Sequence, residues 1–189
     1  MNVDTIHNDD SLRWFALRVR SRCEKVVANL VRRKGFDEFV PLYRCYHNWS
    51  DRRKRLDLPL FPGYVFCRLD PRYRLPVLTI PGALHFAGFG KIPSPLDDAE
   101  ILAIRRAICS GLATEPWEYL ETGQRVKLES GPLAGMEGIL VETPNQCRAV
   151  VSISLLRRSV AVQIERRWLS PVSMGISNNA APAKRWAAL

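Results

Sequence analysis

The sequence lacks the cysteine patterns that mark metal-binding and redox domains. Its five cysteines are odd in number and dispersed, and no two of them form a CxxC pair. This distribution is typical of reduced thiols rather than of disulfides or a zinc site. We therefore expect neither a metal nor a cofactor.

Catalytic motifs are also missing. The three histidines occur singly, and the chain has no HExxH, GxSxG or Walker-type loop. The sequence therefore predicts no catalytic residue and no enzyme. One alternative stays open, a nuclease that would use His47 and Asp51.

No apolar run approaches the ~20 residues that a membrane-spanning helix needs. The start, MNVDTIHNDDSLRW, is acidic and has neither the basic nor the apolar region of a secretion signal. We expect a cytoplasmic protein that does not contact membranes and acts as a monomer.

Positive charge is in excess and is concentrated early. Lysine and arginine number 28 against 19 acidic residues, which gives a net charge of +9. Residues 1–112 hold 19 basic and 12 acidic side chains, whereas 113–189 hold 9 and 7. The front part of the chain is therefore the expected contact for a polyanion.

The front part reads as a mixture of strands and helices. Residues 12–20 alternate between apolar and basic side chains, as a half-solvated strand does. Ser21 and Glu24 fit a capping box at the start of an amphipathic helix that Gly35 ends. Ser94 is the expected N-cap of a second helix.

Residues 58–69, LPLFPGYVFCRL, predict a strand that is entered through Pro62 and Gly63. The basic stretch before it, residues 44–55, is predicted to be a loop or the tip of a hairpin. Side chains of the strand alternate between two faces. One face carries Tyr64 and Phe66, and the other carries Val65, Cys67 and Leu69.

From Gly123 onward the pattern changes to short strands with turns every eight to twelve residues, which indicates a small β-barrel or sandwich. The expected divisions are a disordered N-terminus (1–11), a sheet-and-helix domain (12–111), a linker (112–122), a barrel (123–172) and a disordered tail (173–189).

The string GQRVKLESGPLAGMEGIL, residues 123–140, places Pro132 beside glycines that permit positive φ or close backbone approach. It resembles the KOW domain of the NusG family. WFALRVRSRCEK, LFPGYVF and TIPGALHFAGFG are similar to the family's N-terminal NGN domain. The resemblance covers about residues 12–172. It implies an α+β fold, in which a mostly antiparallel sheet flanked by helices is linked to a small SH3-like β-barrel.

The resemblance also implies a partner, the clamp-helix coiled coil of RNA polymerase. The matching residues are Phe61, Pro62, Tyr64 and Phe66. Rigid aromatic side chains suit such a contact, because aromatic anchors dominate interface energetics. The alternative is that Tyr64 and Phe66 are core, since alternation alone does not say which face of the strand is buried.

Basic residues interleaved with rings predict a nucleic-acid contact, because guanidinium groups bind phosphates and flat rings stack on unpaired bases. The expected residues are Arg20, Arg22, Lys25, Trp49, Arg52, Arg53 and Lys54. The resemblance implies the non-template DNA strand or nascent RNA as the ligand. The alternative is that these basic residues form an ordinary solvent-exposed surface that binds no nucleic acid.

The barrel departs from the family at one loop. Housekeeping members carry S-I-F-G-R where this chain reads S-L-L-R-R, residues 154–158. The expected partner-binding residues are Leu155, Leu156, Arg157 and Arg158. The two arginines argue against Rho as the partner of this loop and suit RNA or an acidic partner instead. A small-subunit ribosomal protein stays open as a further partner.

The implied function is a transcription elongation factor that suppresses pausing and termination. WSDRRKRLDLPLFPGYVF further resembles the UpxY-like paralogues, which implies an operon-specific antiterminator. The alternative is a structural KOW-type RNA-binding protein of the ribosome.

Overall fold

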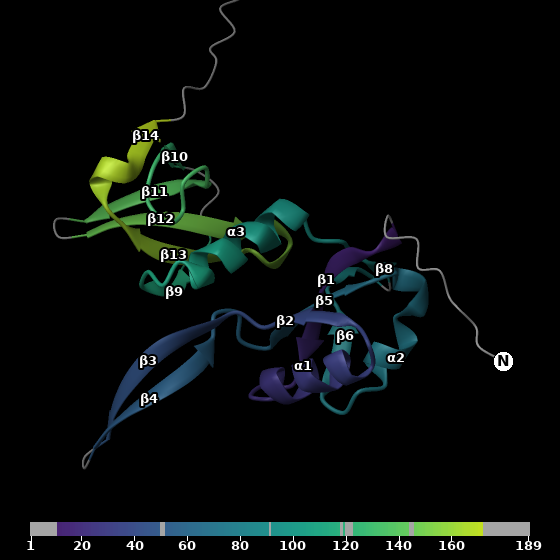
Figure 1. The fold of residues 1–189 in the computed structure, drawn as a ribbon. Coiled ribbons are helices and arrows are strands. Elements are labelled where there is room, and N and C mark those ends of the chain that lie inside the picture. The colour runs from purple at the N-terminus through teal and green to yellow at the C-terminus, as the bar shows by residue number, and fades with distance from the viewer. Residues whose placement is uncertain are drawn as a thin grey trace, which may run out of the picture.

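The chain forms two units, an N-terminal one of sheet and helices and a C-terminal one of strands (Figure 1). This computed structural model describes residues 11–49, 52–90, 92–117, 119, 123–143 and 146–171. The predicted disorder at the two ends of the chain falls outside these ranges, except at Ser11.

The N-terminal sheet has four strands in the order β2-β5-β1-β6. They are β1 (Arg13–Val19), β2 (Asp37–Phe39), β5 (Tyr64–Leu69) and β6 (Ala83–Phe86). Every neighbouring pair is antiparallel. The predicted mostly antiparallel sheet is therefore confirmed.

Helix α1 (Glu24–Arg33) follows β1, but the predicted capping box is wrong. The N-cap is Cys23, and it makes no side-chain capping hydrogen bond. Helix α3 (Asp98–Cys109) is capped by Asp97, whose carboxylate accepts from the Ala99 N–H, and not by Ser94. In both places the local pattern locates the helix and misses its cap by a few residues.

Two short helical turns follow β5. The 3₁₀ turn η2 (Pro71–Tyr73) is capped by Asp70, and α2 (Leu75–Leu78) follows it. Two hairpins complete the N-terminal unit. Strands β3 (Leu42–Trp49) and β4 (Arg52–Pro59) form a long one that projects from the sheet, and β7 (Gly88–Phe89) with β8 (Ile92–Pro93) forms a short one (Figure 1).

The C-terminal unit is a six-stranded antiparallel sheet in the order β14-β10-β11-β12-β13-β9. Its strands are β9 (Thr114–Trp117), β10 (Arg125–Leu128), β11 (Glu137–Thr143), β12 (Gln146–Ile153), β13 (Arg158–Ile164) and β14 (Leu169–Pro171), with 3₁₀ turns η3 (Ser154–Leu156) and η4 (Arg166–Trp168). The predicted strands are present. Strand β9 is an addition, because it lies in the segment predicted to be a linker and pairs with β13.

The glycine-rich string behaves as its composition indicates. Gly131 has φ +80°, and a Cβ there would lie 2.8 Å from the Trp168 ring. Only glycine lets the backbone pass this close to the indole.

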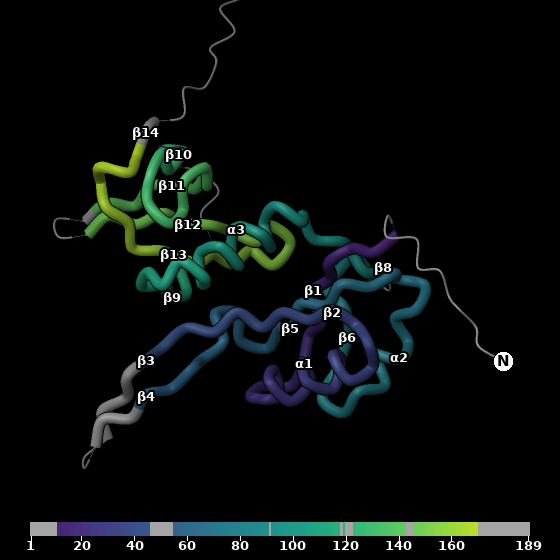
Figure 2. Tube along the Cα trace, viewed as in Figure 1, coloured from purple at the N-terminus to yellow at the C-terminus, as the bar shows by residue number. Residues whose placement is uncertain are grey.

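The two faces of β5 belong to two different hydrophobic clusters. Val65, Cys67 and Leu69 pack beneath α1, in a cluster made wholly of N-terminal residues. Phe66, with Tyr64 at its margin, belongs to a second cluster that continues through α3 into the C-terminal sheet. Figure 2 shows α3 lying between the N-terminal sheet and strand β12.

Candidate functional site

The segment Leu60–Tyr64 forms a tight turn into β5 whose backbone is held at several atoms. The Tyr64 N–H donates to the Phe61 carbonyl at 3.1 Å. Gly63 has φ +79°; its carbonyl accepts from the Val19 N–H at 2.9 Å, and its own N–H donates to the Glu24 carboxylate at 2.7 Å. We call residues 61–64 the FPGY turn.

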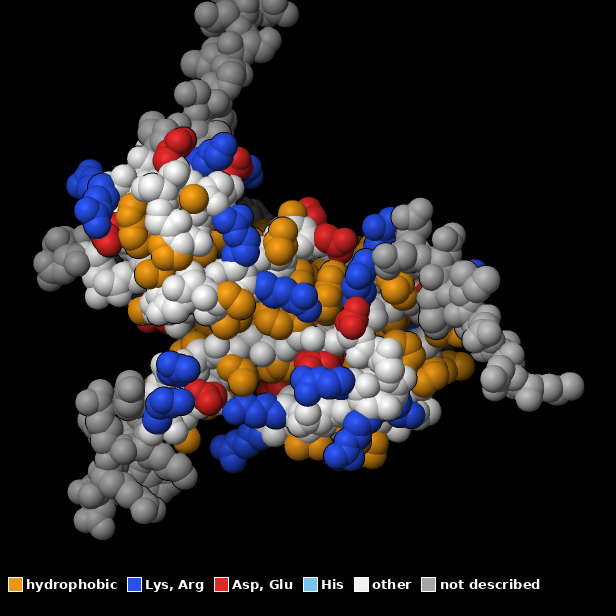
Figure 3. Space-filling model, in the orientation of Figure 1, with side chains coloured by type: hydrophobic (Ala, Val, Ile, Leu, Met, Phe, Trp, Pro, Cys, Tyr) orange, Lys and Arg blue, Asp and Glu red, His pale blue; other side chains and the backbone are white. Residues whose placement is uncertain are grey.

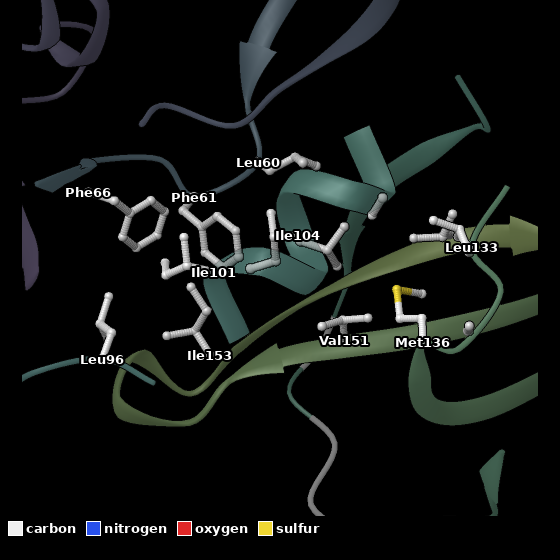
Figure 4. Close-up of a cluster of buried hydrophobic side chains, with 14 of the residues drawn as sticks. Leu60, Phe61, Phe66, Leu96, Ile101, Ile104, Leu133, Met136, Val151 and Ile153 are labelled. Carbon is white, nitrogen blue, oxygen red and sulfur yellow. The ribbon is translucent and has the colours of Figure 1, made fainter. Parts of the chain in front are cut away.

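Two rings of the predicted polymerase-binding set are buried. Phe61 is 1% exposed and Phe66 0% exposed, and their ring centroids lie 5.4 Å apart in an edge-to-face arrangement. Figure 4 shows Phe61 beside Ile101 of α3, with Ile153 of β12 also next to Ile101. The alternative interpretation, in which Phe66 is a core residue, is therefore confirmed for this ring, and Phe61 is buried with it, because the apolar stripe of α3 covers both.

Pro62 and Tyr64 lie at the edge of this buried region. Pro62 is exposed, and Tyr64 is half-buried. The Arg18 guanidinium lies 4.8 Å from the centroid of the Tyr64 ring, and that of Arg158 lies 5.8 Å from it. Both distances are within the range of a cation–π contact. Since Arg158 comes from β13, the C-terminal unit covers part of the Tyr64 ring.

Polar contacts also join α3 to the C-terminal unit. Glu100 of α3 accepts from the Ser154 N–H at 3.1 Å and from its hydroxyl at 2.7 Å. The Arg106 guanidinium donates to the Ala134 carbonyl. We call these bonds, together with the Arg158–Tyr64 pair, the domain contact. A cleft of about 510 Å³ opens next to it, between α3 and the C-terminal sheet.

Three of the predicted nucleic-acid residues lie together at the β1–α1 junction. Arg20, Arg22 and Lys25 are all exposed, and Arg22 holds a left-handed φ of +66°. The Lys25 ammonium donates to the Asp57 carbonyl of β4 at 2.8 Å. The junction is therefore tied to the root of the β3–β4 hairpin. Figure 3 shows Lys and Arg side chains gathered over the α1 side of the N-terminal unit.

The other predicted nucleic-acid residues lie toward the hairpin tip. The backbone pairs Trp49 with Arg52 and Asn48 with Arg53, so the basic stretch does form a hairpin, as predicted. The side chains of Trp49, Arg52, Arg53 and Lys54 are outside the described residues, as are those of His47 and Asp51.

The root of the hairpin meets the junction between the two units. Burial raises the pKa of Tyr43, and the nearby Cys45 and Glu115 raise it further. Tyr43 and Thr114, the first residue of β9, line one groove, so the hairpin root lies close to the segment that joins the units. A groove of about 420 Å³ runs between Tyr43, Ile108 and Leu112.

The predicted partner-binding loop of the C-terminal unit, residues 154–158, is engaged within the molecule. Leu155 and Leu156 are half-buried against the shared cluster. Arg157 adopts a left-handed φ of +48°, and its guanidinium lies 5.3 Å from the centroid of the Tyr119 ring. Arginine thus occupies a backbone conformation that glycine adopts more easily.

Sequence reasoning missed the roles of Glu24, Arg18 and Glu100. The Ser21–Glu24 spacing predicts a helix cap, whereas the Glu24 carboxylate accepts from the Gly63 N–H. The alternation in residues 12–20 puts Arg18 on the solvated face of the strand, but it does not predict that its guanidinium lies over the Tyr64 ring. No local pattern marks Glu100 as a contact between units.

In the described part of the chain, no group of three or more His, Cys, Asp or Glu side chains could hold a metal ion, and no helix there is long and apolar enough to cross a membrane.

The fold and this site define a two-unit α+β protein. Comparisons with known proteins identify its family. The family model described as "Transcription termination factor nusG" matches residues 12–105. The chain belongs to the NusG family of transcription termination and antitermination factors.

Relatives in this family resemble nearly the whole chain. The transcription termination/antitermination protein NusG of Buchnera aphidicola is 29% identical over 178 residues, which cover 86% of this chain and 97% of that one. The NusG of Campylobacter jejuni is 27% identical over 165 residues, covering 80% and 93%. A solved structure titled "Domain interaction in Thermotoga maritima NusG" has a TM-score of 0.54 at 21% identity, and covers 87% of this chain and 99% of that chain. This last likeness concerns the fold alone.

Proposed function

We propose that this protein is a transcription elongation factor that suppresses pausing and termination on particular operons. Its N-terminal unit binds the clamp helices of RNA polymerase through the FPGY turn. Pro62 and Tyr64 make the contact, and Phe61 and Phe66 support them from beneath. It carries out no catalytic step.

The observation that carries this proposal is the rigid presentation of Tyr64. The turn is bonded at both polar atoms of Gly63, and the half-buried Tyr64 packs against the hydrophobic cluster that contains Phe61 and Phe66. A side chain held in this way loses little conformational entropy on binding, which favours it as an interface anchor. Membership of the NusG family supports the same partner.

Binding at this surface requires the C-terminal unit to withdraw. Arg158 covers one side of Tyr64, and the Glu100–Ser154 bonds hold that cover in place. The affinity for polymerase is therefore reduced by the free energy of separating the units. The arginine-bearing loop is released in the same step and becomes available to RNA or to an acidic partner.

Nucleic-acid contact is the second part of the proposal. The exposed cations at the β1–α1 junction and the basic hairpin lie on connected elements, joined by the Lys25–Asp57 bond. A nucleic-acid strand that follows these elements would pass the junction cations and then the hairpin segment whose sequence carries the remaining basic residues and Trp49. We infer single-stranded DNA or RNA as the ligand, with the exposed non-template strand as the first candidate.

The alternative function, a structural RNA-binding protein of the ribosome, would use the C-terminal unit alone. A pull-down with RNA polymerase and with ribosomal subunits in parallel separates the two. We expect retention of polymerase. Retention of ribosomal subunits without polymerase would contradict the proposal.

The sign of the effect on transcription is tested in a reconstituted assay across a terminator, with and without Rho. The template is the leader of the protein's own operon, because UpxY-like similarity implies operon specificity. We expect more read-through when the protein is added. Unchanged or increased termination would contradict antitermination while leaving polymerase binding intact.

A further inference from the structure

Glu24 is a buried carboxylate whose hydrogen bond is made to the FPGY turn. It is 5% exposed and is the first residue of α1. Its Oε1 accepts from the Gly63 N–H at 2.7 Å, across 39 positions of sequence. A buried carboxylate is costly unless it is well bonded, so this contact carries more weight than a surface hydrogen bond.

The bond fixes a residue whose position decides where Tyr64 lies. Gly63 has its N–H bound by Glu24 and its carbonyl bound by the Val19 N–H, so the peptide groups on both of its sides are held. The Arg18 guanidinium occupies the space where a side chain of residue 63 would be: a Cβ there would lie 2.6 Å from Arg18 Nη1. That guanidinium in turn lies 4.8 Å from the centroid of the Tyr64 ring.

We propose that Glu24 is a positioning residue for the polymerase contact. Its carboxylate holds Gly63 so that Pro62 and Tyr64 face the partner in a single orientation. Without that acceptor, the Gly63 peptide is free to rotate, and the Arg18 guanidinium is no longer held beside it. The turn must then be ordered on each binding event, which lowers the affinity. This inference rests on the proposed function, because it concerns the same surface.

A second effect of Glu24 must be separated from the first. A negative charge in the first turn of a helix is stabilising, because the helix dipole is positive there. Glu24 would contribute to the stability of α1 in this way even without the bond to Gly63. The two effects depend on different properties of the side chain, reach and charge.

Three substitutions separate the effect of side-chain length from the effect of side-chain charge. Glu24→Gln keeps an oxygen acceptor at the same distance and removes the charge. Glu24→Asp keeps the charge at the helix start and shortens the side chain by one methylene. Glu24→Ala removes both. Glu38→Ala is the matched control, because Glu38 is a carboxylate of β2 that pairs with Arg32 of the same helix and does not touch the turn.

The affinity of the full chain for RNA polymerase is measured for each variant. We expect Glu24→Gln to stay within about threefold of the unaltered chain, whereas Glu24→Asp and Glu24→Ala lose about tenfold or more. We expect no change for Glu38→Ala. Any other ranking overturns the inference, above all an Asp variant that binds better than the Gln variant, which is the order that a helix-dipole role predicts.

Hydrogen exchange at the Gly63 amide gives a readout that helix stability does not move. We expect slow exchange in the unaltered chain and in Glu24→Gln, and fast exchange in Glu24→Asp and Glu24→Ala. Equal exchange rates in all four proteins would overturn the inference.

Separation of the two units could itself change the affinity for polymerase. The binding series is therefore repeated in a Glu100→Ala background, where part of the domain contact is gone. The same ranking is expected, and a ranking that disappears there would overturn the inference. If the unaltered chain fails to bind polymerase, the proposed function fails and the positioning role falls with it. If it binds and the ranking is wrong, only the positioning role fails.

Discussion

The two faces of the N-terminal sheet are used in opposite ways. The face that carries Val65 and Cys67 packs against α1 in a cluster that is complete within one unit. The face that carries Phe66 is completed only by α3 and the C-terminal sheet. Disturbing the first face should therefore cost stability alone, whereas disturbing the second should change how the units associate and what they bind.

Leu17 tests the first face and gives the largest expected effect. It is 0% exposed in the cluster beneath α1. We expect Leu17→Ala to lower the free energy of unfolding by about 2–5 kcal/mol, because it leaves a cavity in a closed core. Leu102→Ala, at a leucine that is 58% exposed, should cost about 0.5 kcal/mol or less. Urea denaturation measures both, and equal losses would mean that this face is not a closed core.

The basic hairpin belongs to neither face, and its charges are expected to affect only nucleic-acid binding. Reversing Arg52 and Arg53 to Glu should weaken binding to single-stranded DNA by about tenfold and lower the salt slope, since each phosphate contact contributes about 0.7 to it. The control reverses Arg125 and Lys127, two exposed cations of β10, for the same change in net charge. Salt titrations in which both double variants behave alike would remove the hairpin from the contact.

A substitution at Glu100 tests the second face, at the polar contact between α3 and the C-terminal unit. Because it accepts two hydrogen bonds from Ser154, we expect Glu100→Ala to weaken the association of the units by about 1 kcal/mol without unfolding either. Small-angle scattering should report a larger radius of gyration. The exposed Glu129 of the C-terminal unit provides the control, Glu129→Ala, for which no change is expected. An unchanged radius for Glu100→Ala would show that these bonds do not hold the units together.

Asp70 gives the smallest effect, and one that depends on pH. Hydrogen bonds from the Arg72 side chain and backbone hold its pKa at about 2, below the ordinary 3.8. A lowered pKa stabilises the fold fully above pH 3.8 and loses that effect as the pH falls toward 2. The stability difference between the unaltered chain and Asp70→Asn should therefore shrink over this range. A difference that is constant from pH 6 to pH 2 would contradict it.

Much of the fold follows from local patterns. Alternation in residues 64–69 separates the two faces correctly, and turn spacing predicts the C-terminal strands. Strand β9 was missed because TEPW is short and contains Pro116, which reads as a linker residue. Its pairing with β13 is long-range, and no local pattern encodes it.

The site was less predictable than the fold. The apolar stripe of α3 is visible in the sequence, but which surface it covers is not, so alternation alone does not decide whether the face with Phe66 is open or buried. The Ser21–Glu24 spacing matched a cap, and the pattern gave no sign that the carboxylate reaches Gly63 instead. Contacts between distant segments decide both cases.

The central claim is that Tyr64 contacts polymerase and that Arg158 competes for it. Polymerase affinity measured for three variants of the full chain tests this most directly. We expect Tyr64→Ala to lose about thirtyfold, Arg158→Ala to gain about two- to fivefold because a competing cation–π contact is gone, and Tyr73→Ala, at an exposed tyrosine of η2, to change nothing. Affinity that is unaltered in Tyr64→Ala would contradict the account.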